Sequence, residues 1–307
     1  MDSYQDPYWQ TFYEKAWKMR SDYMRDLLKT GQYNTLQIIK MLAKKERFYI
    51  LINAYGNKIG EKELEWKPIK FEETSRHFTG VPVMKTNSLL GNYRYVPFYT
   101  EYRIDKYLVD MIDATGPYDA IVELGCGYGR NLFEIFYNGG PADVCYYGGE
   151  YTKSGENICR ELATATPSMK AEFFHFDHLE PDLSFLSGKF ERLFIFTVHT
   201  IEQVNKIPEC WFKKVCEAAP FVRGVNIEPF GFQMIELGPS SKAQKEFFIR
   251  NNWNLNFANV LKNANERKEV EIEEIMTEHI YSNDLINISS LAVWKHGEDK
   301  FNIRRIE

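Results

Sequence analysis

Residues 120–130 read AIVELGCGYGR, a short apolar run followed by glycines at every second position. The run from Ala120 to Leu124 predicts a buried strand. Gly125, Gly127 and Gly129 predict a sharp turn, because glycine adopts backbone conformations that other residues avoid. A helix is expected directly after the turn, and its free N–H groups and positive dipole end favour an anionic ligand. The segment therefore predicts a strand, a turn and a helix arranged around a bound small molecule.

Strand-like and helix-like patterns alternate after residue 97, which predicts a parallel sheet with helices on both faces. A longer helix is expected over 241–263, and the two late strands that follow it are too close in sequence for a crossover, so they should pair antiparallel. The fold class is thus α/β, with a Rossmann-like, mostly parallel seven-stranded sheet and an antiparallel C-terminal strand pair. The expected strands are 120–124, 144–149, 171–176, 193–198, 222–227, 270–277 and 288–294, and the expected shorter helices are 102–114, 131–137, 154–164 and 208–218.

The N-terminal third has a different pattern of apolar residues. Apolar residues between 8 and 53 recur at helical spacing, with a break at Gly31, and predict two amphipathic helices, the second reaching Ile52. Glycine and proline interrupt residues 56–97, which predicts a long connection with short strands. We expect residues 1–97 to form a helical cap with a connecting segment, and 98–307 to form the α/β domain. Aromatic side chains of the first helix, and those of the segment 94–99, either cover a pocket or only pack the helices together.

The second expected strand ends in an acidic residue, Glu150, at about the spacing from the glycines that suits binding of a ribose diol. The run from Glu123 to Gly129, together with Glu150, resembles the first motif of class I S-adenosylmethionine (SAM)-dependent methyltransferases, an acidic residue followed by GxGxG. Dinucleotide-dependent dehydrogenases usually show GxGxxG instead. The resemblance covers about 200 residues, from Tyr102 to residue 307.

The resemblance implies SAM as the cofactor and gives roles to five residues of the first two strands. Gly125, Cys126 and Gly127 would approach the methionine moiety. Glu123 would fix that end of the cofactor, and Glu150 would accept hydrogen bonds from the ribose hydroxyls. The domain 98–307 is then a class I methyltransferase domain.

The ends of the third, fourth and fifth strands supply the remaining candidates. The resemblance places Asp177 at the adenine amine and Thr197 in the floor beneath the sulfonium. His199 follows the fourth strand at the edge where open parallel sheets bind ligands, and it is the candidate catalytic base, with a packing role as the alternative. Glu202 and Glu228 are further catalytic candidates, as orienting or substrate-binding groups. These three residues do not have a recognised metal-ligand spacing, so we expect no metal.

Composition restricts the partners. The net charge of −5 and the absence of a basic groove argue against a nucleic-acid partner. No apolar segment is long enough for a membrane span, and no secretory signal is evident at the start. Five cysteines without CxxC spacing favour the cytoplasm. The oligomeric state is left open, and a homodimer is compatible with the sequence.

The substrate expected from these features is a small polar molecule. No Asn/Asp-Pro-Pro-Tyr/Phe motif follows the fourth strand, which argues against methylation of a base or amide amine. We expect a SAM-dependent methyltransferase that O-methylates a small molecule such as a sugar or sugar-nucleotide, where the sugar rests on family association alone. One alternative is N-methylation of an amino or guanidino compound held by Glu202 and Glu228. The other is a methyltransferase-like subunit that binds without turnover.

Overall fold

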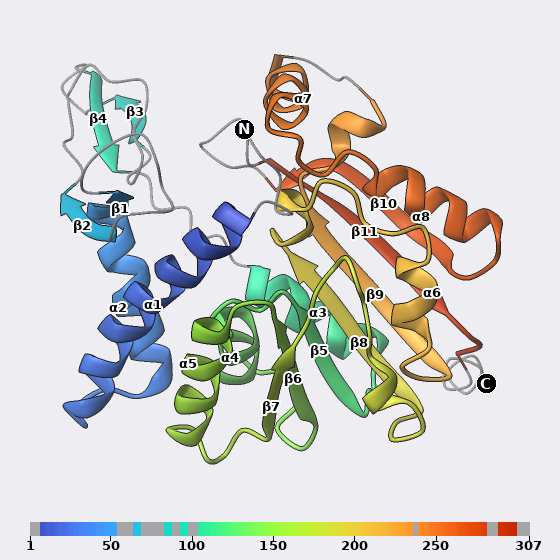
Figure 1. Ribbon diagram of the computed structural model, residues 1–307, viewed down its shortest axis with the longest axis horizontal. Helices are drawn as coiled ribbons and strands as arrows, with labels where there is room; N and C mark the ends of the chain where they lie inside the picture. Colours follow the sequence, from blue (N-terminus) through green and yellow to red (C-terminus); the bar gives the residue numbers. More distant parts are fainter. Residues whose placement is uncertain are drawn as a thin grey trace.

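The computed structural model describes residues 7–53, 64–68, 83–87, 93–97, 104–235, 239–280 and 288–299. A seven-stranded sheet forms its centre (Figure 1). In sheet order the strands are β10 (Glu271–Ile280), β11 (Ser289–His296), β9 (Phe221–Glu228), β8 (Arg192–Val198), β5 (Ala120–Leu124), β6 (Cys145–Glu150) and β7 (Ala171–His175).

The five central strands are parallel, and β11 is antiparallel to both of its neighbours. Counted by their appearance in the chain, the seven strands lie in the order 3-2-1-4-5-7-6. The order in which the strands follow one another across the sheet reverses between β5 and β8. In open α/β sheets, ligands bind at the carboxyl ends of the strands at such a point. The expected fold class is confirmed, and each of the five parallel strands matches its expected bounds to within one residue.

Two layers of helices cover the sheet, because alternate residues of each strand point to opposite faces. Ile121 belongs to one core cluster, with residues of α3 (Ile104–Thr115), α4 (Arg130–Tyr137) and α5 (Lys153–Thr164). Val122 belongs to the other, with residues of α6 (Trp211–Cys216) and α8 (Phe257–Glu266). Thr152 caps the N-terminus of α5, because its side chain accepts a hydrogen bond from the Gly155 N–H.

The N-terminal helices α1 (Pro7–Lys29) and α2 (Thr35–Phe48) share the core of the first face. Met24, Ile38 and Leu42 are fully buried within the same cluster as the sheet residues. The two N-terminal helices therefore pack directly on the α/β sheet domain.

Two expectations about elements are wrong. The second helix ends at Phe48, and residues to Asn53 form strand β1 (Tyr49–Asn53), paired antiparallel with β2 (Leu64–Pro68). The aromatic and β-branched residues of this run favour a strand over a helix. A second hairpin joins β3 (Val83–Asn87) to β4 (Tyr93–Pro97), so the connecting segment does hold short strands. The side chains of 94–97 and residues 98–99 lie outside the described part.

The single helix expected over 241–263 is also wrong, because two helices, α7 (Pro239–Asn251) and α8, occupy this region. Asn252 and Asn254 between them have positive φ values of 60° and 39°. Asparagine tolerates this left-handed backbone better than most residues do, which allows the chain to turn here. The described residues also form three short 3-10 helices, η1 (Ser184–Leu186), η2 (Ile201–Gln203) and η3 (Gly231–Gln233). None of the helices in the described ranges has the length and hydropathy needed to cross a membrane.

Candidate functional site

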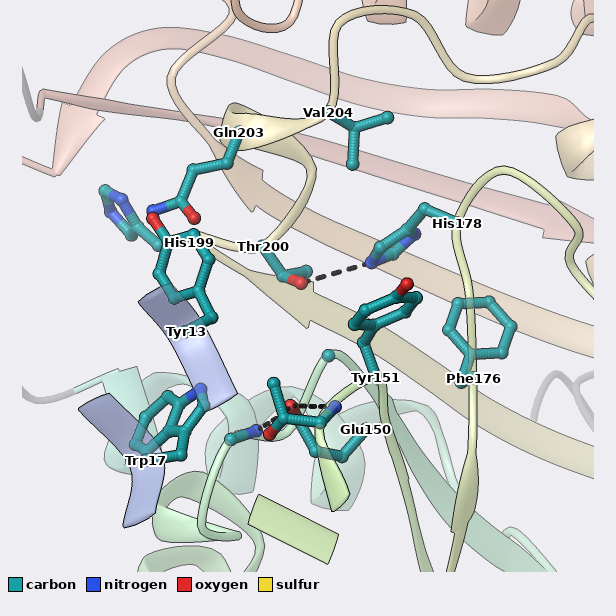
Figure 2. Close-up of a pocket in the computed structure, with 13 residues that line it drawn as sticks. Tyr13, Trp17, Glu150, Tyr151, Phe176, His178, His199, Thr200, Gln203 and Val204 are labelled. Carbon is teal, nitrogen blue, oxygen red and sulfur yellow. Dashed lines mark hydrogen bonds between the residues drawn. The ribbon is translucent and has the colours of Figure 1, made fainter. Parts of the chain in front are cut away.

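A cavity lies at the carboxyl ends of β5, β6 and β8, where the strand order reverses (Figure 2). Its walls come from α1, from the glycine turn after β5, from the end of β6 and from the loops after β7 and β8. The lining residues are Tyr13, Trp17, Gly125, Gly127, Glu150, Tyr151, Thr152, Phe176, His178, His199, Thr200, Gln203 and Val204.

The glycine turn leaves no room for a side chain at Gly125 or Gly127. Gly125 and Gly127 have φ values of 82° and 60°, in the left-handed region that favours glycine. A Cβ on Gly125 would lie 1.8 Å from the Thr200 Oγ1, and a Cβ on Gly127 would lie 2.9 Å from the Trp17 ring. The turn therefore presents bare backbone to the cavity, as binding of a close-fitting ligand requires.

Glu150 ends β6 and lines the cavity beside the turn. One carboxylate oxygen, Oε2, accepts from the Gly127 N–H at 2.8 Å, and Oε1 accepts from the Thr152 N–H at 2.8 Å and from its hydroxyl at 2.7 Å. Burial raises the pKa of Glu150 to about 7, although these hydrogen bonds favour the ionised form. Three of roughly four lone-pair positions are used, which leaves one acceptor position for a ligand.

Glu123 and the Cys126 side chain do not reach the cavity. The Glu123 Oε1 accepts from the Asn131 side-chain amide at 2.6 Å, and its buried Oε2 has no hydrogen-bond partner among the described residues. Burial raises the pKa of Glu123 to about 8. The Cys126 thiol points into the core, 4.0 Å from the Cys159 sulfur, so only the Cys126 backbone belongs to the turn.

His199 lines the cavity from the loop after β8, with a positive φ of 50°. Its ring Nδ1 lies 2.8 Å from the Glu202 Oε2, and its Nε2 lies 2.5 Å from the Ser289 Oγ. Burial alone would lower the pKa of His199, but the charge and hydrogen bond of Glu202, with the charge of Glu228, raise it above the ordinary value. Glu202 thus orients the ring, and Ser289 of β11 holds the opposite nitrogen.

Glu228 lies beneath this loop and outside the cavity lining. Its side chain is fully buried, and both carboxylate oxygens accept from the Thr200 N–H at 3.1 Å. Burial raises the pKa of Glu228 to about 7, although the charge of His199 opposes the shift. In this arrangement Glu228 supports the loop that carries His199 and Thr200.

The structure also places two predicted cofactor residues away from the cavity. Thr197 is buried within the sheet, where its hydroxyl accepts from the Asn226 side chain at 2.9 Å. The Asp177 carboxylate accepts from the Leu179 N–H at 2.8 Å and stabilises its own turn. The next residue, His178, lines the cavity instead, and sequence reasoning missed it because the position of a turn residue does not fix the direction of its side chain.

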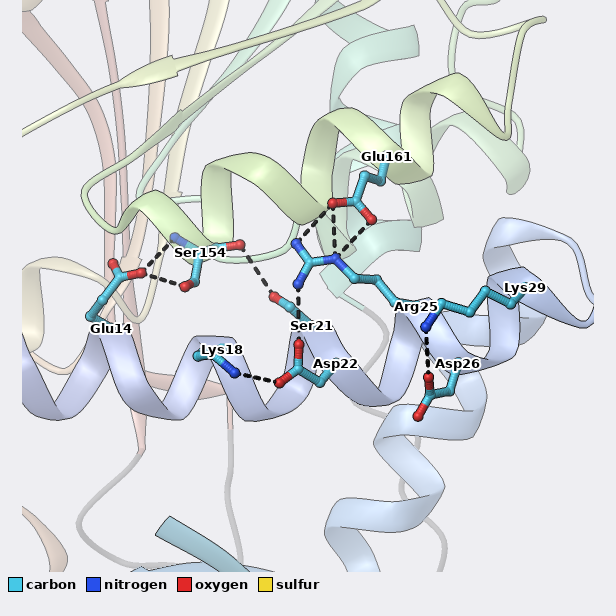
Figure 3. Close-up of polar contacts among 9 residues, drawn as sticks. All are labelled: Glu14, Lys18, Ser21, Asp22, Arg25, Asp26, Lys29, Ser154 and Glu161. Atoms are coloured by element: carbon cyan, nitrogen blue, oxygen red, sulfur yellow. Dashed lines mark hydrogen bonds and ion pairs between the residues drawn. The ribbon is translucent and has the colours of Figure 1, made fainter. Parts of the chain in front are cut away.

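The first helix contributes Tyr13 and Trp17 to the cavity wall (Figure 2). It is held on the N-terminus of α5 by Glu14, which accepts from the Lys153 and Ser154 N–H groups at 2.8 and 2.9 Å (Figure 3). Farther along, Arg25 pairs with Glu161 of α5 at 2.8 Å. The aromatic residues of the first helix were expected either to cover a pocket or only to pack, and these two line the cavity.

Within the described ranges, no group of three or more His, Cys, Asp or Glu side chains is placed to hold a metal ion.

Comparison with known proteins finds similarity in solved structures only. No family model matches the sequence, and no curated protein does. A SAM-dependent methyltransferase from Aquifex aeolicus is 13% identical, with 64% of this chain and 98% of that chain covered and a TM-score of 0.38.

Magnesium protoporphyrin IX methyltransferase from Synechocystis PCC 6803, with bound S-adenosylhomocysteine (SAH), is 13% identical over 64% of this chain and 83% of that one, with a TM-score of 0.45. Geranyl diphosphate methyltransferase, in complex with its substrate and sinefungin, is 10% identical over 64% and 77%, with a TM-score of 0.43. Similarity at this level says nothing about the substrate of this chain. The sheet order and the turn after β5 give the chain the Rossmann-like fold of class I methyltransferases.

Proposed function

We propose that this protein is a SAM-dependent methyltransferase that acts on a hydroxyl group of a small polar molecule. The observation that carries the proposal is the meeting of a side-chain-free glycine turn and the Glu150 carboxylate in one cavity at the switch point of the sheet. SAM is a nucleoside with an amino-acid tail. Its binding needs an acceptor for the ribose hydroxyls and a backbone that allows close approach.

The residues present fit the cofactor. The free acceptor position of Glu150 would take a ribose hydroxyl, and the turn at Gly125 and Gly127 would lie against the methionine moiety. Bound SAM supplies an electrophilic methyl group. The chain's own contribution is then to align the acceptor and to exclude water, which can supply much of the rate.

His199 is the group proposed to receive the acceptor's proton. When the acceptor oxygen bonds the methyl carbon, the carbon–sulfur bond breaks, its electron pair stays on sulfur, and the hydroxyl proton needs a base. His199 lines the cavity and is oriented by Glu202 at 2.8 Å. Because the Nε2 is hydrogen-bonded to the Ser289 hydroxyl, which is buried outside the cavity lining, the transfer requires the ring to release Ser289.

The same geometry favours the hydroxyl acceptor over the amino or guanidino alternative. Glu228 is buried outside the cavity lining and Glu202 is paired with His199, so neither carboxylate is set to hold a cationic substrate. The intact turn and Glu150 support an enzyme over a binding subunit. The sugar or sugar-nucleotide acceptor remains a prediction, and incubation of the protein with a metabolite extract and methyl-labelled SAM would identify the labelled product.

Calorimetric titration with SAH tests the cofactor site. Glu150→Ala should weaken SAH binding by about 10-fold or more, because a hydrogen bond to a charged group contributes about 1.5–3 kcal/mol. Glu172→Ala, an exposed glutamate of β7 outside the cavity lining, is the control and should bind as the wild type does. Unchanged SAH affinity in a folded Glu150→Ala variant would overturn the assignment.

A further inference from the structure

Thr200 lies between the glycine turn and the base that the proposed function names. It follows His199 directly, lines the cavity, and packs so closely on the turn that a Cβ on Gly125 would lie 1.8 Å from its Oγ1. Its backbone N–H donates to the buried Glu228 carboxylate at 3.1 Å. These contacts hold the Thr200 side chain where, in the proposed function, the methyl donor and the acceptor would meet.

A buried imidazole contacts the Thr200 hydroxyl. The His178 Nε2 lies 3.1 Å from the Thr200 Oγ1 (Figure 2), and the His178 ring stacks on Trp211 with centroids 6.0 Å apart and planes at 21°. Burial lowers the pKa of His178 to about 3, so the ring is neutral and carries a proton on one nitrogen only. Its buried Nδ1 has no hydrogen-bond partner in the described part of the chain.

These contacts place the proton of the ring on Nε2. A buried N–H group without a partner is rarer in folded proteins than a buried acceptor without one, so the unpaired Nδ1 favours the tautomer in which Nδ1 carries no proton. The His178 Nε2–H then donates to the Thr200 Oγ1. The hydrogen of the Thr200 hydroxyl has no acceptor among the described residues, and it is therefore available to a ligand in the cavity.

The chemistry of methyl transfer indicates which ligand group accepts this hydrogen bond. A hydroxyl oxygen has two lone pairs and one proton. One lone pair forms the bond to the methyl carbon, the carbon–sulfur electron pair stays on sulfur, and the proton passes to His199, so the second lone pair can accept from Thr200. A neutral amine nitrogen has a single lone pair and cannot both attack the methyl carbon and accept a hydrogen bond.

We propose that the Thr200 hydroxyl, directed by His178, donates a hydrogen bond to the acceptor oxygen and thereby selects hydroxyl acceptors over amines. Thr200 contacts the substrate, and His178 is a positioning residue that acts through Thr200. This inference rests on the proposed function and deepens it, because it names the group that distinguishes oxygen from nitrogen in the same cavity.

Incubation with a metabolite extract and [methyl-¹³C]SAM tests the inference, because the carbon chemical shift of the product separates a methyl on oxygen from a methyl on nitrogen. Thr200→Val keeps the shape of the side chain and should lower the initial rate of O-methylation about 10-fold, the loss expected for one hydrogen bond, with SAH affinity near wild type. Thr200→Ser keeps the hydroxyl and should retain most of the rate. Thr164→Val, at an exposed threonine of α5 outside the cavity lining, is the control and should keep the wild-type rate.

A double variant tests the part played by His178. His178→Phe keeps a ring against Trp211 but removes both nitrogens, and it should lower the rate of O-methylation less than Thr200→Val does. Added to Thr200→Val, it should cause no further loss, because its effect passes through the Thr200 hydroxyl. Additive losses in the double variant would show that His178 does not act through Thr200.

The outcomes separate this inference from the proposed function. If the wild-type protein binds no SAH, or places the label on nitrogen only, the proposed function fails. If it methylates oxygen and Thr200→Val keeps the wild-type rate, or loses SAH affinity as well, Thr200 is not the acceptor contact and the proposed function stands. ¹⁵N spectra of the wild-type histidine side chains need no acceptor and no variant. The His178 Nε2 should carry the proton, and a protonated Nδ1 would overturn the inference.

Discussion

Ligand binding should change the protonation of the Glu150 carboxyl. In the free protein burial raises its pKa to about 7, and a ribose hydroxyl that donates to it would favour the ionised form. Binding should therefore release about half a proton at pH 7, and SAH affinity should rise with pH through about 7 and then level off. Titrations in buffers of different ionisation enthalpy measure the release. Glu150→Gln cannot ionise and should lose this component, so an unchanged pH dependence in that variant would contradict the assignment.

His199 should give the pH–rate profile its acidic limb. A base acts in its neutral form, and the raised pKa of His199 means that kcat should rise with pH through a value above the ordinary 6.5 or so. His199→Ala should lower kcat by about 10²–10⁴-fold with SAH affinity near wild type. Glu202→Gln removes the charge that raises the pKa and should move the limb to lower pH. If His199→Ala keeps the wild-type rate, the acceptor needs no base and the N-methylation alternative gains support.

At the scale of the element, one carboxylate of α1 contacts the start of α5. Glu14 accepts from two N–H groups at the start of α5, and the N-terminus of a helix favours negative charge. Glu14→Gln should lower the free energy of unfolding by about 1 kcal/mol, as loss of a capping contact typically does, and urea titration measures it. Asp26→Asn on the same helix loses only an exposed pair with Lys29 and should change stability little. Equal effects of the two variants would show that Glu14 does not hold the helix.

Element boundaries were predicted well where local pattern and tertiary structure agree. Four of the five parallel strands, β5, β6, β8 and β9, are buried along almost their whole length, and burial on both faces keeps such short runs recognisable. The second N-terminal helix was extended too far, because the apolar run after Phe48 is compatible with either periodicity. The break at Asn252 was missed because asparagine occurs within helices as well as in left-handed turns, and the sequence pattern did not decide between the two.

At the scale of the whole molecule, the mostly parallel sheet followed from the alternation of strands and helices, but the cavity followed only in part. Of the candidate site residues, Gly125, Gly127, Glu150 and His199 line it. The others surround or support it, because a position at a strand end fixes the place of a residue and not the face to which its side chain points. The predicted residues outside the lining are Glu123, Cys126, Asp177, Thr197, Glu202 and Glu228.

The wall that α1 provides also determines when the cavity can form during synthesis. Glu14 leaves the ribosome long before its partners on α5, which follow 139 and 140 residues later. At about 5–20 residues per second, roughly ten seconds separate the two, and the end of β8 is made later still. During that interval the apolar side of α1 has no sheet to pack on. The segment that forms α1 therefore reaches these native neighbours only after α5 and the end of β8 are made, and the cavity is complete only when they have met.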